Sequence, residues 1–189
     1  MGGRDGKSPP AIGFLTVVPH EQHGLFGGYL MLDPGGRPLE FHCTAPIKPN
    51  RAQEILFGPT LQSYVYGEQI GRTLVEAGRA QPLVICTDLA PVLALREHVE
   101  LPVVLLAPAD ENESSSSAAV QHRIDAAHPR PVPSVSFRLG SHRLSIAAGF
   151  AEDQTLVSQR LASVAERMDL LEPFARIREA IDEAQRSGK

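Results

Sequence analysis

Short apolar runs separated by turn residues fill the first part of the chain. The run Ile12–Val18 is apolar and rich in β-branched residues, and it predicts a first strand. The segments Gly28–Leu32 and Pro38–Thr44 flank the turn sequence DPGG and together predict a hairpin. In the second segment Leu39 and Phe41 alternate with polar residues, which is typical of a strand with one buried face. An antiparallel meander of three strands is therefore expected to open the fold.

Two later runs, Pro82–Cys86 and Pro102–Ala107, are apolar throughout, as in strands that are buried on both faces of a parallel sheet. Helical spacing of apolar residues predicts helices between the strands, at Arg51–Phe57, at Leu61–Ala77 and directly after Asp88. Parallel strands joined through helices form right-handed crossovers, so the meander continues into βαβ units. The sequence thus predicts an α/β fold with a mixed sheet, and the order of its elements resembles that of RNase H-like folds.

The second part of the chain begins with a polar stretch rich in serine and proline, whose composition predicts a flexible linker. After it, alternating apolar residues predict a hairpin, and helical spacing predicts two helices. The last helix carries an apolar stripe of Phe174, Ile177 and Ile181. The predicted organisation is a disordered leader at residues 1–10, a mixed α/β core at 11–108, the linker at 109–133, and a C-terminal hairpin with amphipathic helices at 134–189 that packs on the core.

Composition limits the classes of function. The chain has 18 Lys and Arg against 22 Asp and Glu, a net charge of −4, and 5% aromatic residues without Trp. This balance argues against binding of nucleic acid through its phosphates or by base stacking. Cys43 and Cys86 are too few for a disulfide framework and fit core thiols in a reducing compartment. The sequence shows neither a signal peptide nor an apolar run of membrane-spanning length, so a cytoplasmic protein with no membrane partner is predicted.

Candidate chemistry gathers where the predicted parallel strands end. No phosphate-binding loop, zinc-protease motif or nucleophile elbow occurs in the chain. Open α/β sheets bind ligands at the carboxyl edge of their strands, and the prediction places His20, His23 and Asp88 there, with Glu68 from the crossover helix. The first three are donor types that zinc accepts, so Zn or Mn is the expected metal of a site in which His20, Glu68 and Asp88 are catalytic. The simpler interpretation makes Asp88 a helix cap and both histidines solvated loop residues.

A second group of polar residues surrounds the start of the helix Arg51–Phe57. Asn50 and Gln53 have the spacing of a capping box, and Lys48 and Arg51 are close to the same helix end. Lys48, Asn50 and Arg51 are therefore a candidate site for a small anion or an acidic partner, the alternative being a rigid connection with solvated charges. The stretches FHCTAPIKPNRAQEILFGPTL and YGEQIG resemble an uncharacterised bacterial protein family over about the first two thirds of the chain. The resemblance implies a bacterial protein and no particular activity.

Three functions remain open from the sequence. The first is a non-catalytic interaction or regulatory subunit of a bacterial cytoplasmic assembly, with a protein partner or a second copy bound through the C-terminal helix. The alternative is a metal-dependent hydrolase, nuclease included, that acts at the carboxyl strand ends. The third is a sensor that binds a small anion. A cofactor, Zn or Mn, is expected only for the hydrolase, and for the other two functions the cofactor is unknown. The metal content of the purified protein distinguishes the first two.

Overall fold

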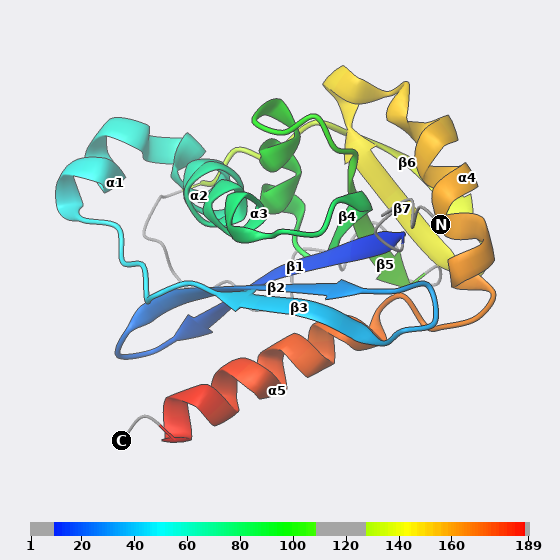
Figure 1. Cartoon of the computed structure of the whole chain (residues 1–189). Helices are drawn as coiled ribbons and strands as arrows, with labels where there is room; N and C mark the ends of the chain where they lie inside the picture. Colours follow the sequence, from blue (N-terminus) through cyan, green and yellow to red (C-terminus); the bar gives the residue numbers. More distant parts are fainter. Residues whose placement is uncertain (1–9, 109–127, 188–189) are drawn as a thin grey trace, which may run out of the picture.

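The structure, a computed structural model, describes residues 10–108 and 128–187. Its strands are β1 (Ala11–His20), β2 (Gly24–Leu32), β3 (Pro38–Cys43), β4 (Pro82–Thr87), β5 (Val103–Pro108), β6 (Ser134–Leu139) and β7 (His142–Ala147). They form one seven-stranded mixed sheet in the order β3-β2-β1-β4-β5-β7-β6, which confirms the predicted fold class (Figure 1). Nearly all of the predicted leader and residues 109–127 of the predicted linker lie outside the described residues.

The first five strands follow the predicted meander and crossovers. Strand β2 pairs antiparallel with both β1 and β3, and β4 runs parallel to both β1 and β5. The two continuously apolar runs are therefore adjacent central strands, as their composition predicts. The C-terminal hairpin completes the same sheet, because β7 pairs antiparallel with β5 and β6 pairs antiparallel with β7. An RNase H-like order of five strands is thus extended by two more.

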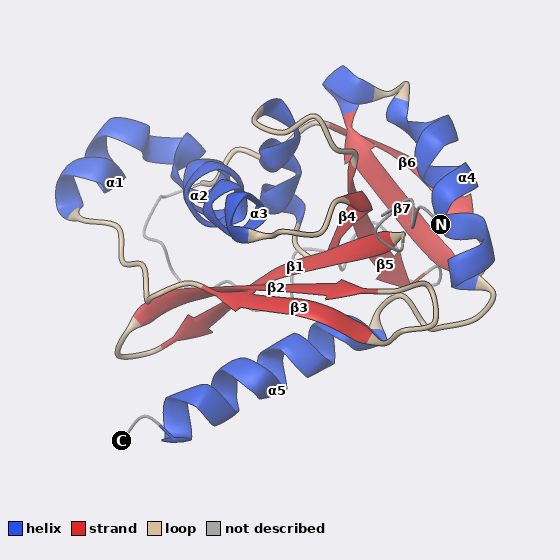
Figure 2. Ribbon diagram, in the orientation of Figure 1, coloured by secondary structure: helices blue, strands red, loops and turns tan. Residues whose placement is uncertain are grey.

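Helices cover both faces of the sheet (Figure 2). The helical segments are α1 (Arg51–Phe57), η1 (Gly58–Thr60), α2 (Leu61–Ser63), the π-helical η2 (Tyr64–Arg72), α3 (Thr73–Ala77), the 3-10 helices η3 (Ala90–Glu97) and η4 (Ala148–Phe150), α4 (Asp153–Ala165) and α5 (Glu172–Ser187). The segments α2 to η3 pack their apolar side chains on one face, and α4 and α5 pack theirs on the other. Among the described residues, no helix has the length and apolarity to cross a membrane.

Two glycines allow helices to approach closely. A Cβ atom at Gly67 in η2 would lie 2.8 Å from the backbone nitrogen of Leu95 in η3. A Cβ atom at Gly28 in β2 would lie 2.3 Å from a methyl carbon of Ile177 in α5. Such contacts leave no room for a side chain. Glycine has a low helix propensity. At position 67 the close packing of η2 against η3 that glycine allows compensates for this cost.

The apolar stripe of α5 is buried within the chain. Phe174, Ile177 and Ile181 are each 1% exposed or less and belong to the apolar cluster under β1 and β2. The Phe174 ring packs edge-to-face on Phe14, with ring centroids 5.7 Å apart. Since this chain's own sheet covers the stripe, only the polar face of α5 is left for the partner or second copy that the sequence predicts at this helix.

The edge strand β3 differs from its prediction. Its apolar residues Leu39 (37%) and Phe41 (41%) are exposed, whereas Glu40 and His42 on the opposite face are half-buried. The alternation in the sequence defines two faces but not which of them a neighbouring layer covers. Cys43 is also exposed, so its prediction as a core thiol is wrong, while Cys86 is buried as expected.

Candidate functional site

Asp88 follows β4 at the carboxyl edge of the sheet, where the sequence predicts a site. Because Leu15 pairs with Thr87, Asp88 is level with Thr16 on β1. Thr16 Oγ1 donates a hydrogen bond of 2.7 Å to Asp88 Oδ1, and the guanidinium of Arg178 in α5 pairs with Oδ2. The Asp88 side chain is 16% exposed. Its carboxylate is therefore satisfied by groups of its own chain.

Asp88 does not cap the helix that follows it. Leu89 occupies the cap position of η3, and no side chain caps that helix. The Leu89 N–H instead donates to Thr87 Oγ1 at 3.2 Å, a local turn that hydroxyl side chains form. The capping interpretation of Asp88 is wrong because its carboxylate binds β1 and α5 instead.

His20 and His23 lie at the turn between β1 and β2. His20 is four residues beyond Thr16 along β1, about 13 Å at the usual rise of a strand. His20 Nδ1 accepts hydrogen bonds from the backbone N–H groups of Gln22 (3.2 Å) and His23 (3.3 Å), and the two imidazole centroids are 4.6 Å apart. The structure brings the two histidines together, but it does not bring them to Asp88. Across residues 10–108 and 128–187, no three His, Cys, Asp or Glu side chains gather as a metal site requires.

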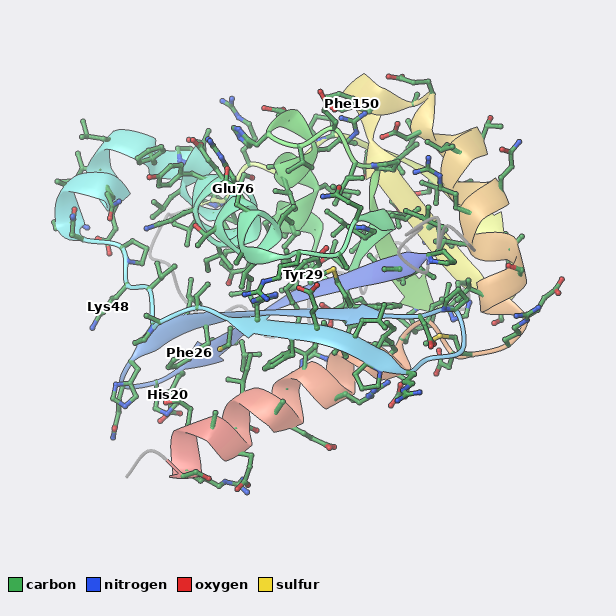
Figure 3. All side chains as sticks on the ribbon, in the orientation of Figure 1. His20, Phe26, Tyr29, Lys48, Glu76 and Phe150 are labelled. Carbon is green, nitrogen blue, oxygen red and sulfur yellow. The ribbon has the colours of Figure 1, made fainter. Side chains whose placement is uncertain are left out.

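The residues of the predicted anion site are mostly engaged within α1. The Asn50 side chain accepts a hydrogen bond of 2.9 Å from the Gln53 N–H and completes the predicted capping box. The Arg51 guanidinium donates to Glu54 at 3.0 Å. Lys48 is exposed beside the turn between β1 and β2, near His20 (Figure 3). A role of these three residues in ligand binding stays a prediction from the sequence.

A cleft lies where α1, η1 and η2 meet η3 and the segment that precedes β6. Its volume is about 310 Å³. Its lining residues are Phe57, Thr60, Ser63, Tyr64, Glu68, Ala94, Glu97, His98 and Arg130 to Pro133. The Phe57 and Tyr64 rings stack with centroids 4.0 Å apart and an interplanar angle of 18°. This cavity, named here the α1 cleft, thus combines an aromatic pair with charged side chains.

Glu68, which the sequence predicts at the carboxyl edge, lines the α1 cleft. Its Oε2 lies 3.8 Å from His98 Nε2. Glu97 and Arg130 line the same cavity, and within the described part of the chain neither belongs to an ion pair. Glu68 sits in the π-helical segment, and π turns occur frequently at functional sites. The cleft therefore presents charged groups that a ligand can pair with.

Two apolar side chains of α1 face solvent next to this cleft. Ile55 is 65% exposed and Leu56 is 83% exposed, and α1 has no buried residue. These two residues are named here the α1 surface, and α1 stands at the outer end of its helical layer (Figure 1). A signal in the sequence was missed: Ile55, Leu56 and Phe57 are consecutive, and three consecutive residues of a helix cannot all face the same side.

Glu40 shows how a carboxylate is used to hold the fold together. It accepts hydrogen bonds from the backbone N–H groups of Arg79 (2.9 Å) and Ala80 (2.7 Å), and His42 Nε2 lies 2.9 Å from it. The Arg79 N–H, the His42 imidazole and the Ala80 N–H hold the pKa of Glu40 below its usual range. The Glu40 side chain therefore ties β3 to the residues that follow α3.

An ion pair between Arg96 and Asp153 joins η3 to α4. Arg96 Nε donates to Asp153 Oδ2 at 2.7 Å, and the Arg96 guanidinium also donates to the Val99 carbonyl and lies 4.1 Å from the centroid of the Phe150 ring. Asp153 is 6% exposed. With every charged atom engaged inside the fold, this pair is a structural contact.

A second cavity, of about 490 Å³, lies between β7 and the turn that joins α4 to α5. In its wall His142 Nε2 is 3.3 Å from Asp169 Oδ1, and Ser141 Oγ is 3.5 Å from His142 Nδ1. A nucleophile and its base need a separation of about 2.6–3.2 Å. Both distances in this structure are longer than that range.

Comparisons with known proteins place the chain in no family. Neither a protein-family model nor a curated protein matches it. Among solved structures it is similar to a cysteine-substituted catalytic domain of human Endonuclease V, with a TM-score of 0.44 and 14% identity, covering 95% of this chain and 85% of that one. A structure of human ENDOV gives a TM-score of 0.45 and 13% identity, covering 96% and 87%. The first of these neighbours is named as an endonuclease. Similarity at this level does not transfer that activity to this chain.

Proposed function

We propose that this chain is a non-catalytic binding protein that takes up a segment of a partner protein at the α1 surface and the α1 cleft. The observation that carries the proposal is the exposure of Ile55 (65%) and Leu56 (83%) in the same turn of α1 as Phe57, which lines the cleft. Single exposed apolar residues are common on protein surfaces. Two adjacent ones on a helix whose next residue lines a cavity with aromatic walls favour a binding site.

Burial of the α1 surface stabilises such a complex. Fully burying an Ile or Leu side chain is worth about 1.5–3 kcal/mol, and both side chains are more than half exposed in the free chain. A gain of about 3 kcal/mol corresponds to two powers of ten in affinity. The capping box at Asn50 fixes the start of α1, so these side chains are presented on an ordered helix and little entropy is lost on binding.

The carboxyl edge of the sheet supports binding rather than hydrolysis. Asp88 is paired with Arg178, whereas a carboxylate that holds a catalytic divalent cation needs further oxygen or nitrogen donors beside it. The described residues around Asp88 do not fit such a donor set. The metal-binding and catalytic roles of His20, His23, Glu68 and Asp88 stay predictions from the sequence.

A phage-displayed library of short random peptides, selected on the full chain, tests the proposal. We expect one family of related peptides whose affinity, measured by fluorescence anisotropy, falls at least about tenfold in the double variant Ile55→Ser/Leu56→Ser. Leu39→Ser is the matched control, because Leu39 is exposed and apolar but lies on the edge strand. The control should bind like the wild type. Selection of no peptide family, or equal affinity of wild type and double variant, would contradict the proposal.

The hydrolase alternative has a separate test. Elemental analysis of the wild type and of the variants His20→Ala and Asp88→Ala measures whether these residues hold a metal. We expect the three proteins to have the same metal content, since Asp88 is paired with Arg178. Stoichiometric Zn or Mn that disappears in both variants would favour the hydrolase.

A further inference from the structure

A short segment of this chain, Arg130–Pro133, lines the α1 cleft opposite its helices. Its backbone is fixed at both ends, by a hydrogen bond of 2.8 Å from the Arg130 N–H to the Pro59 carbonyl and by one of 2.8 Å from the Ala148 N–H to the Pro133 carbonyl. Of its side chains, only Val132 is half-buried and packs against the core, and the other three are exposed. The segment is therefore one wall of the cleft, and Val132 is the side chain that packs it onto the core.

This segment has a composition that suits the cleft. Prolines favour the extended polyproline II conformation before they bind, so little entropy is lost when they are ordered. Proline-rich segments dock into grooves lined by aromatic side chains, and Phe57 and Tyr64 are such a pair. The helical side of the cleft supplies the carboxylates of Glu68 and Glu97, which complement a cation such as Arg130. The internal segment thus indicates what chemistry an external one would need.

We infer that the α1 cleft binds a proline-containing, basic segment of a partner protein, and that Arg130–Pro133 is a weak internal occupant of the same site. This inference rests on the proposed function and specifies the chemistry of the partner. The partner's prolines pack on the aromatic pair, its cation pairs with Glu68 and Glu97, and its flanking apolar residues cover the α1 surface. The free volume of about 310 Å³ between the internal segment and the helices is at the lower end of the usual range for ligand sites.

An internal occupant lowers the apparent affinity for a partner. A tethered segment competes at an effective concentration in the millimolar range, and affinity falls in proportion to the fraction of molecules whose site is free. Loosening the internal segment should therefore strengthen binding of an external one. Val132→Ser is the suitable change, because it removes the half-buried apolar contact of the segment and leaves its prolines in place.

Binding of labelled synthetic peptides, measured by fluorescence anisotropy, tests the inference. The probe has the sequence HPRPVP with Gly-Ser flanks, a first control peptide HPEPVP replaces its cation, and a second control peptide HARAVA removes its prolines. We expect the probe to bind the Val132→Ser protein about tenfold more tightly than the wild type. Both control peptides should bind at least about tenfold more weakly than the probe.

A second variant keeps the test independent of how Val132→Ser folds. Glu68→Gln/Glu97→Gln should weaken binding of the probe at least about tenfold, because it removes both carboxylates of the cleft. Glu76→Gln is the matched control, since Glu76 is exposed on α3 (Figure 3) and its ion pair among the described residues is with Arg72.

The outcomes separate this inference from the proposed function. Equal binding of the three peptides, or unchanged binding by Glu68→Gln/Glu97→Gln, would overturn the inference. A selected peptide family that requires Leu56 but contains neither proline nor a basic residue would overturn it and leave the proposed function standing. Probe binding that requires Glu97 supports the inference whether or not it requires Ile55 and Leu56, because the Gly-Ser flanks of the probe have no apolar side chain to cover the α1 surface.

Discussion

The carboxyl edge of the sheet and the α1 cleft use their charged side chains in opposite ways. At the carboxyl edge, Asp88 accepts from Thr16 on β1 and pairs with Arg178 on α5, so one carboxylate joins three elements. In the α1 cleft, Glu68 lies 3.8 Å from His98, and Glu97 has no ion-pair partner within the described residues. The position where open α/β sheets bind ligands is thus closed by internal contacts, while a peripheral cleft keeps its polar groups accessible.

This contrast separates stability from recognition. A buried polar group that loses its partner costs stability, so the groups at the carboxyl edge are expected to be sensitive to substitution. A solvated group contributes little to stability but is available to a ligand. Substitutions in the two regions should therefore affect different measurements.

The largest expected effect is on α5, which packs under β1 and β2 and supplies Arg178 to the carboxyl edge. Phe174→Ala removes a ring that is 1% exposed and packs on Phe14, and it should lower the free energy of unfolding by about 3–5 kcal/mol, because a cavity remains. Leu56→Ala, at an 83% exposed position of the α1 surface, should change it by less than about 0.5 kcal/mol. Urea denaturation measures both values. Similar losses in the two variants would erase the contrast between the regions.

A smaller loss is expected for the carboxylate itself. Asp88→Ala leaves the fully buried Thr16 hydroxyl without its acceptor, so the free energy of unfolding should fall by about 1–3 kcal/mol. A double-mutant cycle with Arg178→Met should give a coupling of about 1 kcal/mol or less, since the Arg178 side chain is 44% exposed. An unchanged denaturation midpoint in Asp88→Ala would mean that this carboxylate contributes as little to stability as the carboxylates of the cleft.

Glu40 extends the comparison to pH. Its pKa is lowered in the folded state, so its stabilisation is complete above the ordinary Glu pKa of about 4.3 and is lost as the pH falls through the lower folded value. Glu40→Gln should therefore be less stable than the wild type at neutral pH, and the difference should narrow below about pH 4. Thermal unfolding across this range measures the effect. A constant difference at every pH would show that hydrogen bonding to the neutral side chain, and not charge, fixes β3.

The smallest effect on stability is expected in the cleft. Glu97→Gln should change the free energy of unfolding by less than about 0.5 kcal/mol, because Glu97 is exposed and has no ion-pair partner in the described ranges. The same variant should weaken binding of the proline-containing probe. A large loss of stability would indicate that Glu97 supports the fold. The carboxyl edge and the α1 cleft would then both contribute to stability, which contradicts the expected contrast between them.

Local patterns in the sequence predicted the elements whose causes are local. The capping box of Asn50 and Gln53 marks the start of α1, and the stop at Gly58 marks its end. The apolar runs that became β4 and β5 are buried on both faces, so no choice of face arises for them. The apolar stripe of α5 was equally clear from its helical spacing, although the sequence left open what covers it.

The site could not be predicted in the same way because its parts are far apart in the chain. The α1 cleft combines residues of α1 and η2 with Glu97 of η3 and with Arg130–Pro133, and no short pattern spans them. Asp88 looked like a helix cap because Leu89 and the helix follow it directly, but its partners are Thr16 and Arg178. Similarly, Glu68 was expected beside Asp88 but faces the cleft.

Hydrophobic spacing and capping by themselves determined the mixed α/β class, the central strands and the helical segments, because these depend on interactions between neighbours in sequence. Only the tertiary structure decided which face of β3 is exposed, that the C-terminal hairpin joins the sheet, and that α5 is covered by β1 and β2. Those outcomes depend on which layers meet, and contacts between layers join residues too distant in sequence for a local pattern to relate.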